Sequence, residues 1–480
     1  MTGPLKDKRW SALILLCLGE LMIVLDTTIV NVALPSIQAD LHFNETALVW
    51  VVNAYMLTFG GFLLLGGRLG DLFGHRRLFL AGIVLFTLAS LACGLASTQT
   101  MLIAARAVQG LGGAVVSAVA LSLIMNMFTE PGERARAMGV YGFVCAGGGS
   151  VGVLLGGVLT SSLSWHWVFL VNLPVGVAIC AACLSLLPGG RGQAQQGQRL
   201  DVAGAFSITA SLMLAVYAIV NGNAAGWASM QTLALLGAAL ALLLIFIVIE
   251  SRVATPLVPL GLFKLHNLAI SNVIGVLWAA AMFAWFFVSA LYLQLVLGYS
   301  AMQVGLAFLP ANLIMAAFSL GLSAKMVMRW GIRPPLVAGL VLAGIGLALF
   351  ARAPVSGSFW LDVFPGMLLL GLGSGMALNP VLLAAMDDVS PAESGLASGV
   401  VNTAFMMGGA LGLAVLASLA DARTDALRTA GTDAVAALNG GYQLAFLMGA
   451  VFAGVAATLG TRLRPTQAAA KAAEAAQVQA

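Results

Sequence analysis

The chain reads LDTTIVNVALP from Leu25 to Pro35, within the first of many long apolar segments, and this stretch places the Asp26 carboxylate among residues suited to lipid. A charged side chain at the centre of a bilayer costs about 2.5 to 3.5 kcal/mol on insertion scales. A charge that persists there therefore lines a cavity, pairs with another group or carries protons. Asp26 is a functional candidate on this ground alone.

The composition predicts a polytopic membrane protein. Of 480 residues, 61% are hydrophobic and only 8% are charged, and the mean hydropathy is +1.01. These values are far too apolar for a soluble globular protein. The 56 glycines suit close helix contacts in lipid. The five cysteines lie in apolar stretches without a CxxC pair or a histidine cluster, so we expect no disulfide and no metal site.

Windows of about 20 apolar residues give the candidate transmembrane spans. The fourteen spans lie near residues 11–35, 48–66, 78–97, 101–125, 137–160, 167–187, 202–221, 232–250, 268–296, 303–324, 335–352, 361–385, 395–419 and 441–461. The basic N-terminus before the first span is similar to a signal peptide, but no small-residue cleavage site follows it. We therefore interpret the first span as retained.

The distribution of Lys and Arg predicts that both termini lie in the cytoplasm. With a cytoplasmic N-terminus, eighteen of the 22 Lys and Arg residues fall in inner loops and tails and only three in outer loops, as the positive-inside rule requires. The remaining cation, Arg106, lies within the fourth span. Among the acids, only Glu20 and Asp26 lie clearly inside a span. The net charge of +4 follows from these inner loops and implies no nucleic-acid partner.

An internal repeat predicts two halves of six spans each. The repeated residues are Pro131, Glu133, Ala137, Gly139, Gly148, Gly149 and Gly152, and their later counterparts are Pro391, Glu393, Ala397, Gly399, Gly408, Gly409 and Gly412. Duplicated halves around a central cavity are a known transporter plan. The predicted domains are an N-terminal half (1–187), a linker with two inserted helices (188–264), a C-terminal half (265–464) and a cytoplasmic tail (465–480).

Arg106 is the second functional candidate. Residues three, four and seven apart share a helix face, so Arg106 aligns with Gln109, Gly110 and Gly113 in a stripe that is small and polar. The alternative is a structural arginine satisfied by backbone carbonyls. Glu20 lies about 120° around the first span from Asp26, so we expect the two acids to have different roles. A merely polar, pore-lining role for Glu20 stays an equal alternative.

Four motifs in order suggest a family. Residues 67–78 read GRLGDLFGHRRL, which resembles the major facilitator signature G-x-L-x-D-x-x-G-R-R with His75 at the first basic position. LIAARAVQG (102–110) is similar to that superfamily's fourth-span motif. Residues 25–35 resemble the opening signature of its fourteen-span drug:proton antiporter branch, and WHWVFLVNLP (165–174) resembles that branch's connection between the fifth and sixth spans.

The resemblance implies an all-α major facilitator fold with two six-helix halves, two inserted helices and fourteen transmembrane helices. It also implies a cytoplasmic gate and proton coupling. The gate residues are Gly67, Asp71, Gly74, Arg76 and Arg77, and the proton-coupling residues are Asp26, Arg106 and Glu20. Gly74 permits a tight turn there, and the acid and bases beside it can form charge-assisted bonds.

The fifth span departs from the branch pattern. Its signature is G-x-x-x-G-P-x-x-G-G, whereas residues 148–157 read GGSVGVLLGG with Val153 in place of proline. The kink that proline favours is therefore lost. The antiporter-motif glycines are Gly148, Gly152, Gly156 and Gly157, and they keep the close helix contact. For each glycine, helix packing alone is the alternative interpretation.

Polar and aromatic residues of several spans are candidates for a substrate cavity. They are Asn31, Asn53, Trp285, Phe286, Tyr292 and Asn312. Aromatic rings and adaptable methionines favour large apolar or amphipathic ligands. The alternative is that the rings face lipid or pack between helices.

These observations predict proton-coupled efflux of hydrophobic or amphipathic drugs, antibiotics or dyes by alternating access in a bacterial cytoplasmic membrane. The motif G-x-x-x-x-G-K-[ST] of ATP sites is absent. A proton symporter or dedicated exporter of one endogenous metabolite is the alternative, and a membrane-embedded enzyme or sensor is a remote one. Beyond protons, the small-molecule substrate and the bilayer, we expect no cofactor and no catalytic residue, and we expect the protein to act as a monomer.

Overall fold

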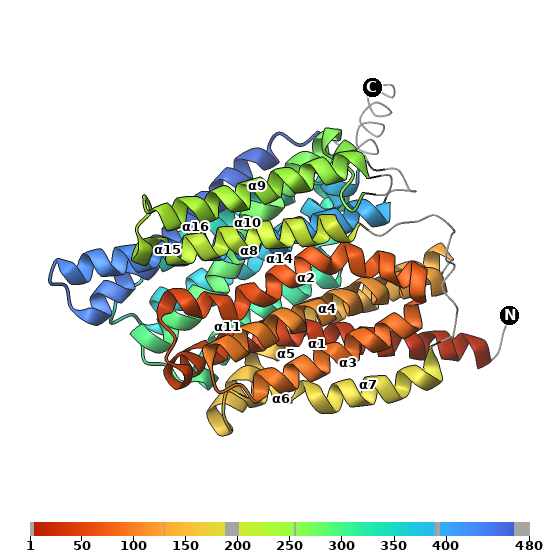
Figure 1. Cartoon of the computed structure of the whole chain (residues 1–480), viewed down its shortest axis with the longest axis horizontal. Helices are drawn as coiled ribbons and strands as arrows, with labels where there is room; N and C mark the ends of the chain where they lie inside the picture. The colour runs from red at the N-terminus through yellow and green to blue at the C-terminus, as the bar shows by residue number, and fades with distance from the viewer. Residues whose placement is uncertain are drawn as a thin grey trace. The chain divides into compact units, whose positions relative to one another are not determined.

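The regular elements of the protein are helices. The computed structural model describes residues 4–128, 130–187, 201–253, 256–387, 389 and 394–464, and no strand occurs in these ranges (Figure 1). Twelve helical stretches there are long and apolar enough to cross a membrane, and two shorter apolar ones, Val151–Ser162 and Ala301–Ala317, overlap the predicted spans 137–160 and 303–324. The predicted all-α polytopic fold is confirmed, whereas the count of fourteen transmembrane helices stays a prediction.

The chain divides into two compact units. The first comprises residues 1–257 and 290–309, and the second comprises residues 258–289 and 310–480. The ends of two helices are therefore shared, because α10 (His266–Leu291) and α11 (Ala301–Ala317) each cross a boundary between the units.

Helix pairs form the core of the first unit. Its first seven helices are α1 (Pro4–Leu41), α2 (Glu45–Phe73), α3 (His75–Gly94), α4 (Gln99–Met127), α5 (Pro131–Ser162), α6 (Trp167–Leu170) and α7 (Asn172–Leu186). α2 and α3 both pack on α4, α1 packs on α5, and α7 packs on α3 and α1. The Asn44 side chain accepts a hydrogen bond from the Ala47 backbone N–H at 2.6 Å and so begins α2.

Two further helices of the first unit correspond to the predicted insertion. α8 (Val202–Ala225) and α9 (Met230–Arg252) pack on each other, and α8 also packs on α2. Aromatic pairs join α8 to α2, since Phe62 meets the Phe206 ring edge-on at 5.1 Å. Leu240 and Leu244 of α9 are more than half exposed, as expected for side chains that face lipid.

The second unit has its own helix pairs. Its remaining elements are η1 (Leu260–Lys264), η3 (Phe318–Leu322), α12 (Ser323–Trp330), α13 (Arg333–Phe350), η4 (Phe359–Val363), α14 (Phe364–Met386), α15 (Ser394–Thr429) and α16 (Ala434–Gly460), while η2 (Tyr292–Val296) belongs to the first unit. α13 packs on α14 and α16, and α16 packs on α15. Gly339 and Gly373 let α13 and α14 approach closely, because a Cβ at Gly339 would lie 2.7 Å from the Gly373 carbonyl oxygen.

The repeated glycines occupy equivalent places in the two units. In the first unit, a Cβ at Gly148 would lie 3.0 Å from Val24 of α1. In the second, a Cβ at Gly408 of α15 would lie 2.8 Å from Val276 of α10. In each unit, a repeated glycine therefore brings one long helix close to another. The division into two six-helix halves stays a prediction.

Candidate functional site

Asp26 and Arg106 meet inside the first unit. Asp26 lies on α1 and Arg106 on α4, and the two side chains are 0% and 1% exposed. Arg106 donates a hydrogen bond from Nη1 to Asp26 Oδ2, so the groups form a buried ion pair. A buried charge is tolerated only when it is paired and hydrogen-bonded. The two charges that sequence analysis singled out therefore compensate each other.

The Arg106 guanidinium has further partners. Its Nε donates to the Val51 carbonyl oxygen at 2.9 Å, and its Nη1 also donates to Gln109 Oε1 at 2.7 Å. The Tyr55 ring lies 4.4 Å from Arg106 Cζ and the Phe169 ring lies 5.6 Å from it, within the range of cation–π attraction. Arg106 thus bonds to a backbone carbonyl, as expected for a structural arginine, and also to a carboxylate, as expected for a functional one.

Two side-chain amides hold the second oxygen of Asp26. Gln109 Nε2 donates to Asp26 Oδ1 at 2.7 Å, and Asn172 Nδ2 donates to the same atom at 3.1 Å. Both amides also donate to Ser90 Oγ, at 3.1 Å and 2.9 Å. The Ser90 hydroxyl in turn donates to the Phe169 carbonyl oxygen at 3.0 Å. One connected network therefore joins α1, α3, α4 and α7 around the carboxyl group of Asp26.

A close contact between α2 and α4 fixes the position of Arg106. The Thr58 hydroxyl of α2 donates to the Ala107 carbonyl oxygen at 2.8 Å. A Cβ at Gly110 would clash with Thr58 Oγ1 and with the Tyr55 carbonyl oxygen. Because Gly110 has no side chain, α4 approaches α2 closely enough for Arg106 to reach the Val51 carbonyl.

Three residues of this network were not predicted as site residues, namely Ser90, Tyr55 and Asn172. The helical spacing placed Gln109 on the face of Arg106, and the structure brings the two together. Asn172 is the first residue of α7 and lies in the WHWVFLVNLP segment, so this motif was the signal for it. Ser90 lies within an apolar span with no such motif. Only the packing of α3 against α4 and α7 reveals its role.

Glu20 belongs to a different cluster. Its carboxylate is buried and accepts a hydrogen bond from Ser117 Oγ of α4 at 3.0 Å. Tyr141 of α5 also interacts with this carboxyl group. Among the described contacts none joins Glu20 to Asp26 directly, which agrees with their different faces on α1. The proton-coupling role of Glu20 stays a prediction.

The glycines of α5 lie against α1 near Asp26. A Cβ at Gly152 would clash with the Thr28 hydroxyl, and a Cβ at Gly156 would lie 2.6 Å from the Ile29 carbonyl oxygen. A Cβ at Gly157 would lie 2.8 Å from the Ala301 carbonyl oxygen of α11. α5 is one helix through Val153. These glycines therefore set how closely α5 approaches the turn of α1 that follows Asp26.

The predicted gate is described only in part. Gly74 has a φ of +92° and connects α2 directly to α3, as the predicted tight turn requires. Arg76 donates from Nη2 to the Leu184 carbonyl oxygen of α7 at 2.7 Å, and Arg77 is exposed. Gly67 faces Ala118 of α4. The Asp71 side chain lies outside the described residues, so the gate stays a prediction.

The predicted substrate-cavity residues are mostly buried. Asn31, Asn53 and Tyr292 lie in the first unit, and Trp285, Phe286 and Asn312 lie in the second. The Asn31 amide donates to the Thr27 carbonyl oxygen of its own helix at 3.1 Å. The rings of Trp285 and Phe286 are 4.4 Å apart. Their role in substrate binding stays a prediction.

Comparisons with known proteins cover nearly the whole chain. A family model described as the Major Facilitator Superfamily matches residues 16–413. The puromycin resistance protein pur8 of Streptomyces alboniger is 40% identical over 449 residues, which cover 92% of this chain and 88% of the relative. The cephamycin export protein CmcT of Amycolatopsis lactamdurans is 38% identical, with 86% and 85% covered. The tetracenomycin C resistance and export protein of Streptomyces glaucescens is 34% identical, with 87% and 77% covered.

A solved structure shows the same fold. A variant of the nucleoside transporter NupG superposes with a TM-score of 0.65 and covers 96% of this chain and 100% of that chain. Its sequence is only 13% identical to this one, so the likeness concerns the fold alone.

Proposed function

The chain belongs to the Major Facilitator Superfamily of membrane transporters, and from this premise we propose that it exports hydrophobic or amphipathic small molecules, antibiotics among them, in exchange for protons. Relatives named for puromycin resistance and cephamycin export support the substrate class. The buried Asp26–Arg106 pair carries the proposal of proton coupling. It is a titratable carboxylate held inside the membrane beside a fixed cation.

The network gives Asp26 two distinct states. When ionised, its Oδ2 accepts from Arg106 and its Oδ1 accepts from Gln109 and Asn172, so each of these three partners donates to the charged form. When protonated, the carboxyl group becomes a donor and its attraction to Arg106 is lost. Protonation therefore loosens a junction of α1 with α4 and α7. This is the local change that alternating access requires.

Two states of this junction are enough for antiport. Asp26 takes up a proton when the site opens to the outside and releases it when the site opens to the cytoplasm. The membrane potential supplies about 2.3 kcal/mol per charge per 100 mV, and a tenfold concentration ratio is worth about 1.4 kcal/mol. One proton per cycle thus sustains a substrate gradient of roughly fiftyfold. No nucleotide is needed.

The transporter lies in a bacterial cytoplasmic membrane with both termini inside and acts as a monomer. Arg76, Arg77, Asp71 and the glycines near them form the cytoplasmic gate. The two inserted helices, α8 and α9, stand between the two six-helix halves in the chain, as the predicted domains have it.

Dedicated export of one compound is the second candidate function. It is favoured by the names of CmcT and the tetracenomycin C protein, which each refer to one antibiotic or antibiotic class. Expression in an efflux-deficient bacterium distinguishes the two. Resistance to several unrelated lipophilic compounds supports multidrug export, and resistance to one supports dedicated export. If the expressed protein raises resistance to none of the tested compounds, it does not export them.

The same host tests the role of Asp26. Asp26→Asn removes the charge of the network, whereas Asp40→Asn changes an exposed carboxylate at the end of the same helix, which accepts from Trp165 Nε1 at 2.9 Å. We expect Asp26→Asn to abolish resistance and Asp40→Asn to retain it. Equal resistance in both variants would remove Asp26 from the mechanism.

A further inference from the structure

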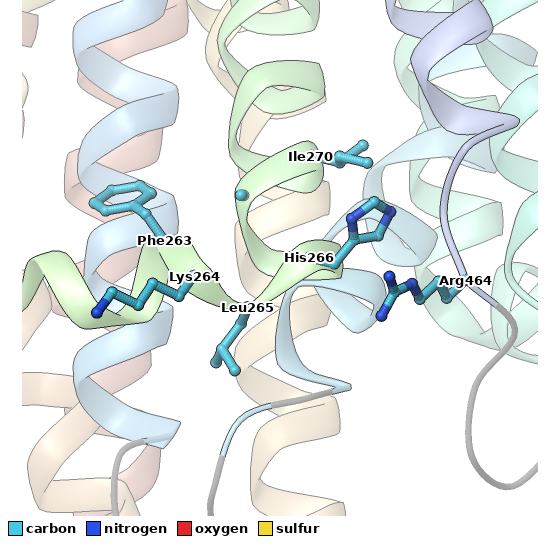
Figure 2. Close-up of a pocket in the computed structure, with 7 residues that line it drawn as sticks. Phe263, Lys264, Leu265, His266, Ile270 and Arg464 are labelled. Atoms are coloured by element: carbon cyan, nitrogen blue, oxygen red, sulfur yellow. The ribbon is translucent and has the colours of Figure 1, made fainter.

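A cavity of about 600 Å³ opens in the second unit where η1 meets α10, whereas the Asp26 network belongs to the first unit (Figure 2). The lining residues that matter here are Phe263, Lys264, Leu265, His266, Ile270 and Arg464. Three of the lining side chains are basic, and none is acidic. The cavity therefore has the charge to receive an anion.

The cationic groups are available to a ligand. Within the described part of the chain, neither Lys264 nor Arg464 takes part in an ion pair, and both are exposed. Figure 2 shows His266 and Arg464 pointing toward one another, whereas Lys264 extends away from them beyond Leu265. Lys264 still lines the same cavity, so its positive charge adds to the attraction for an anion between His266 and Arg464.

A buried amide builds this arrangement. Asn267 is 2% exposed, and its Oδ1 accepts from the Arg464 backbone N–H at 2.9 Å while its Nδ2 donates to the Arg464 carbonyl oxygen at 3.4 Å. A His266 ring nitrogen also contacts the Arg462 carbonyl oxygen at 3.2 Å. The chain that follows α16 is therefore tied to the first turn of α10. Asp387 lies nearby, but its Oδ2 accepts from Asn267 at 3.4 Å and it does not line the cavity.

The surroundings combine positive charge with apolar surface. α10 begins at His266 and is a candidate membrane span, so the cavity lies at the end of a span. The first turn of a helix carries unpaired N–H groups and partial positive charge, which favour an anion. Phe263 is 40% exposed, and Leu265 and Ile270 also line the cavity. A soluble inorganic anion would make no favourable contact with these apolar side chains, whereas the acyl chain of a lipid would pack against them.

We propose that this cavity binds an anionic phospholipid. The phosphate group contacts His266 and Arg464, Lys264 adds positive charge to the same cavity, and an acyl chain lies along Phe263 and the start of α10. Basic pockets at the ends of transmembrane helices are suited to such headgroups. Lipid binding at this cavity is independent of the exported substrate and of proton coupling.

Native mass spectrometry of the purified protein tests the proposal. Delipidated wild type is titrated with phosphatidylglycerol and with phosphatidylcholine of the same acyl chains. We expect preferential binding of phosphatidylglycerol, and we expect Lys264→Gln/Arg464→Gln to weaken it roughly thirtyfold, the effect of two cations near a charged surface. The matched control is Lys325→Gln/Arg329→Gln, which removes two exposed cations of α12 and should leave the affinity unchanged.

Several outcomes would overturn the proposal. These are equal binding of the two lipids, an equal loss in both double variants, and displacement of the lipid by inorganic phosphate at the same concentration. The last result would show a free-anion site. If the Lys264→Gln/Arg464→Gln variant does not fold, the wild-type comparison of the two lipids and the phosphate competition still decide between lipid, free anion and no specific site.

Discussion

Arg106 of α4 donates a hydrogen bond from Nη1 to the carboxylate of Asp26 on α1, and both side chains are almost fully buried. Each charge compensates the other. Removing one partner of a buried ion pair leaves an uncompensated charge and typically lowers the stability of the protein by about 3–5 kcal/mol. The same pair is the part of the structure on which proton coupling depends. Stability and transport can therefore be measured separately on one set of variants.

The first prediction separates these two effects. Asp26→Asn should destabilise the purified protein by about 3–5 kcal/mol, because Arg106 is then buried without a counter-charge. Asp26→Asn/Arg106→Gln should recover part of that loss while export stays abolished. Chemical denaturation in detergent measures the stability. Additive losses in the double variant would show that the two charges do not compensate each other.

The second prediction concerns the ring beneath Arg106. Tyr55 lies 4.4 Å from Arg106 Cζ, and its buried hydroxyl has no hydrogen-bond partner among the described residues. Tyr55→Phe keeps the ring, so it should leave stability and export nearly unchanged. Tyr55→Leu should cost about 2 kcal/mol, since a desolvated cation–π contact is lost. If Tyr55→Phe lowered the stability as much as Tyr55→Leu, the hydroxyl and not the ring would stabilise Arg106.

The third prediction uses a small steric change. A Cβ at Gly152 would clash with the Thr28 hydroxyl, whereas a Cβ at Gly149 would lie 3.9 Å from Thr28 Cγ2. Gly152→Ala should therefore destabilise the protein by about 1–3 kcal/mol through overpacking between α5 and α1. Gly149→Ala is the matched control and should be neutral. Thr28→Ala in the Gly152→Ala background should restore part of the stability and of the export rate.

The fourth prediction tests the amide network. Asn172 donates to both Asp26 and Ser90, so Asn172→Ala should cost about 1–3 kcal/mol. Asn172→Asp is closer in shape but should be worse for export, because it places a second carboxylate beside Asp26. Asn221→Asp, on α8 and bonded only to the Tyr217 carbonyl oxygen in the described contacts, should be silent. If Asn172→Asp transports better than Asn172→Ala, the network does not serve an ionised Asp26.

The sequence allowed the main parts of the site to be predicted. Asp26 and Arg106 stood out because a charge within an apolar span is costly wherever it lies. Helical spacing brought Gln109 to the face of Arg106, since residues three apart are neighbours on a helix. The motifs identified the family, which the comparisons confirm.

Other parts of the site depend on tertiary packing. Ser90 and Asn172 join Asp26 from α3 and α7, and no local pattern relates residues so far apart in the chain. α8 packs on α2 through aromatic pairs such as Phe62 and Phe206. In the sequence, neither phenylalanine differs from the other apolar residues of its span. Lys264 and Arg464 are two of the eighteen Lys and Arg residues in predicted inner loops and tails. That they line one cavity follows only from the fold.

The central claim is that substrate export is coupled to protons through Asp26 and Arg106. The most direct measurement is proton release from everted vesicles with an acidic lumen when ethidium is added, at matched expression of wild type, Asp26→Asn, Arg106→Ala and Asp40→Asn. We predict proton release by wild type and Asp40→Asn and none by the other two variants. Undiminished, ethidium-dependent release by Asp26→Asn and Arg106→Ala would contradict the claim.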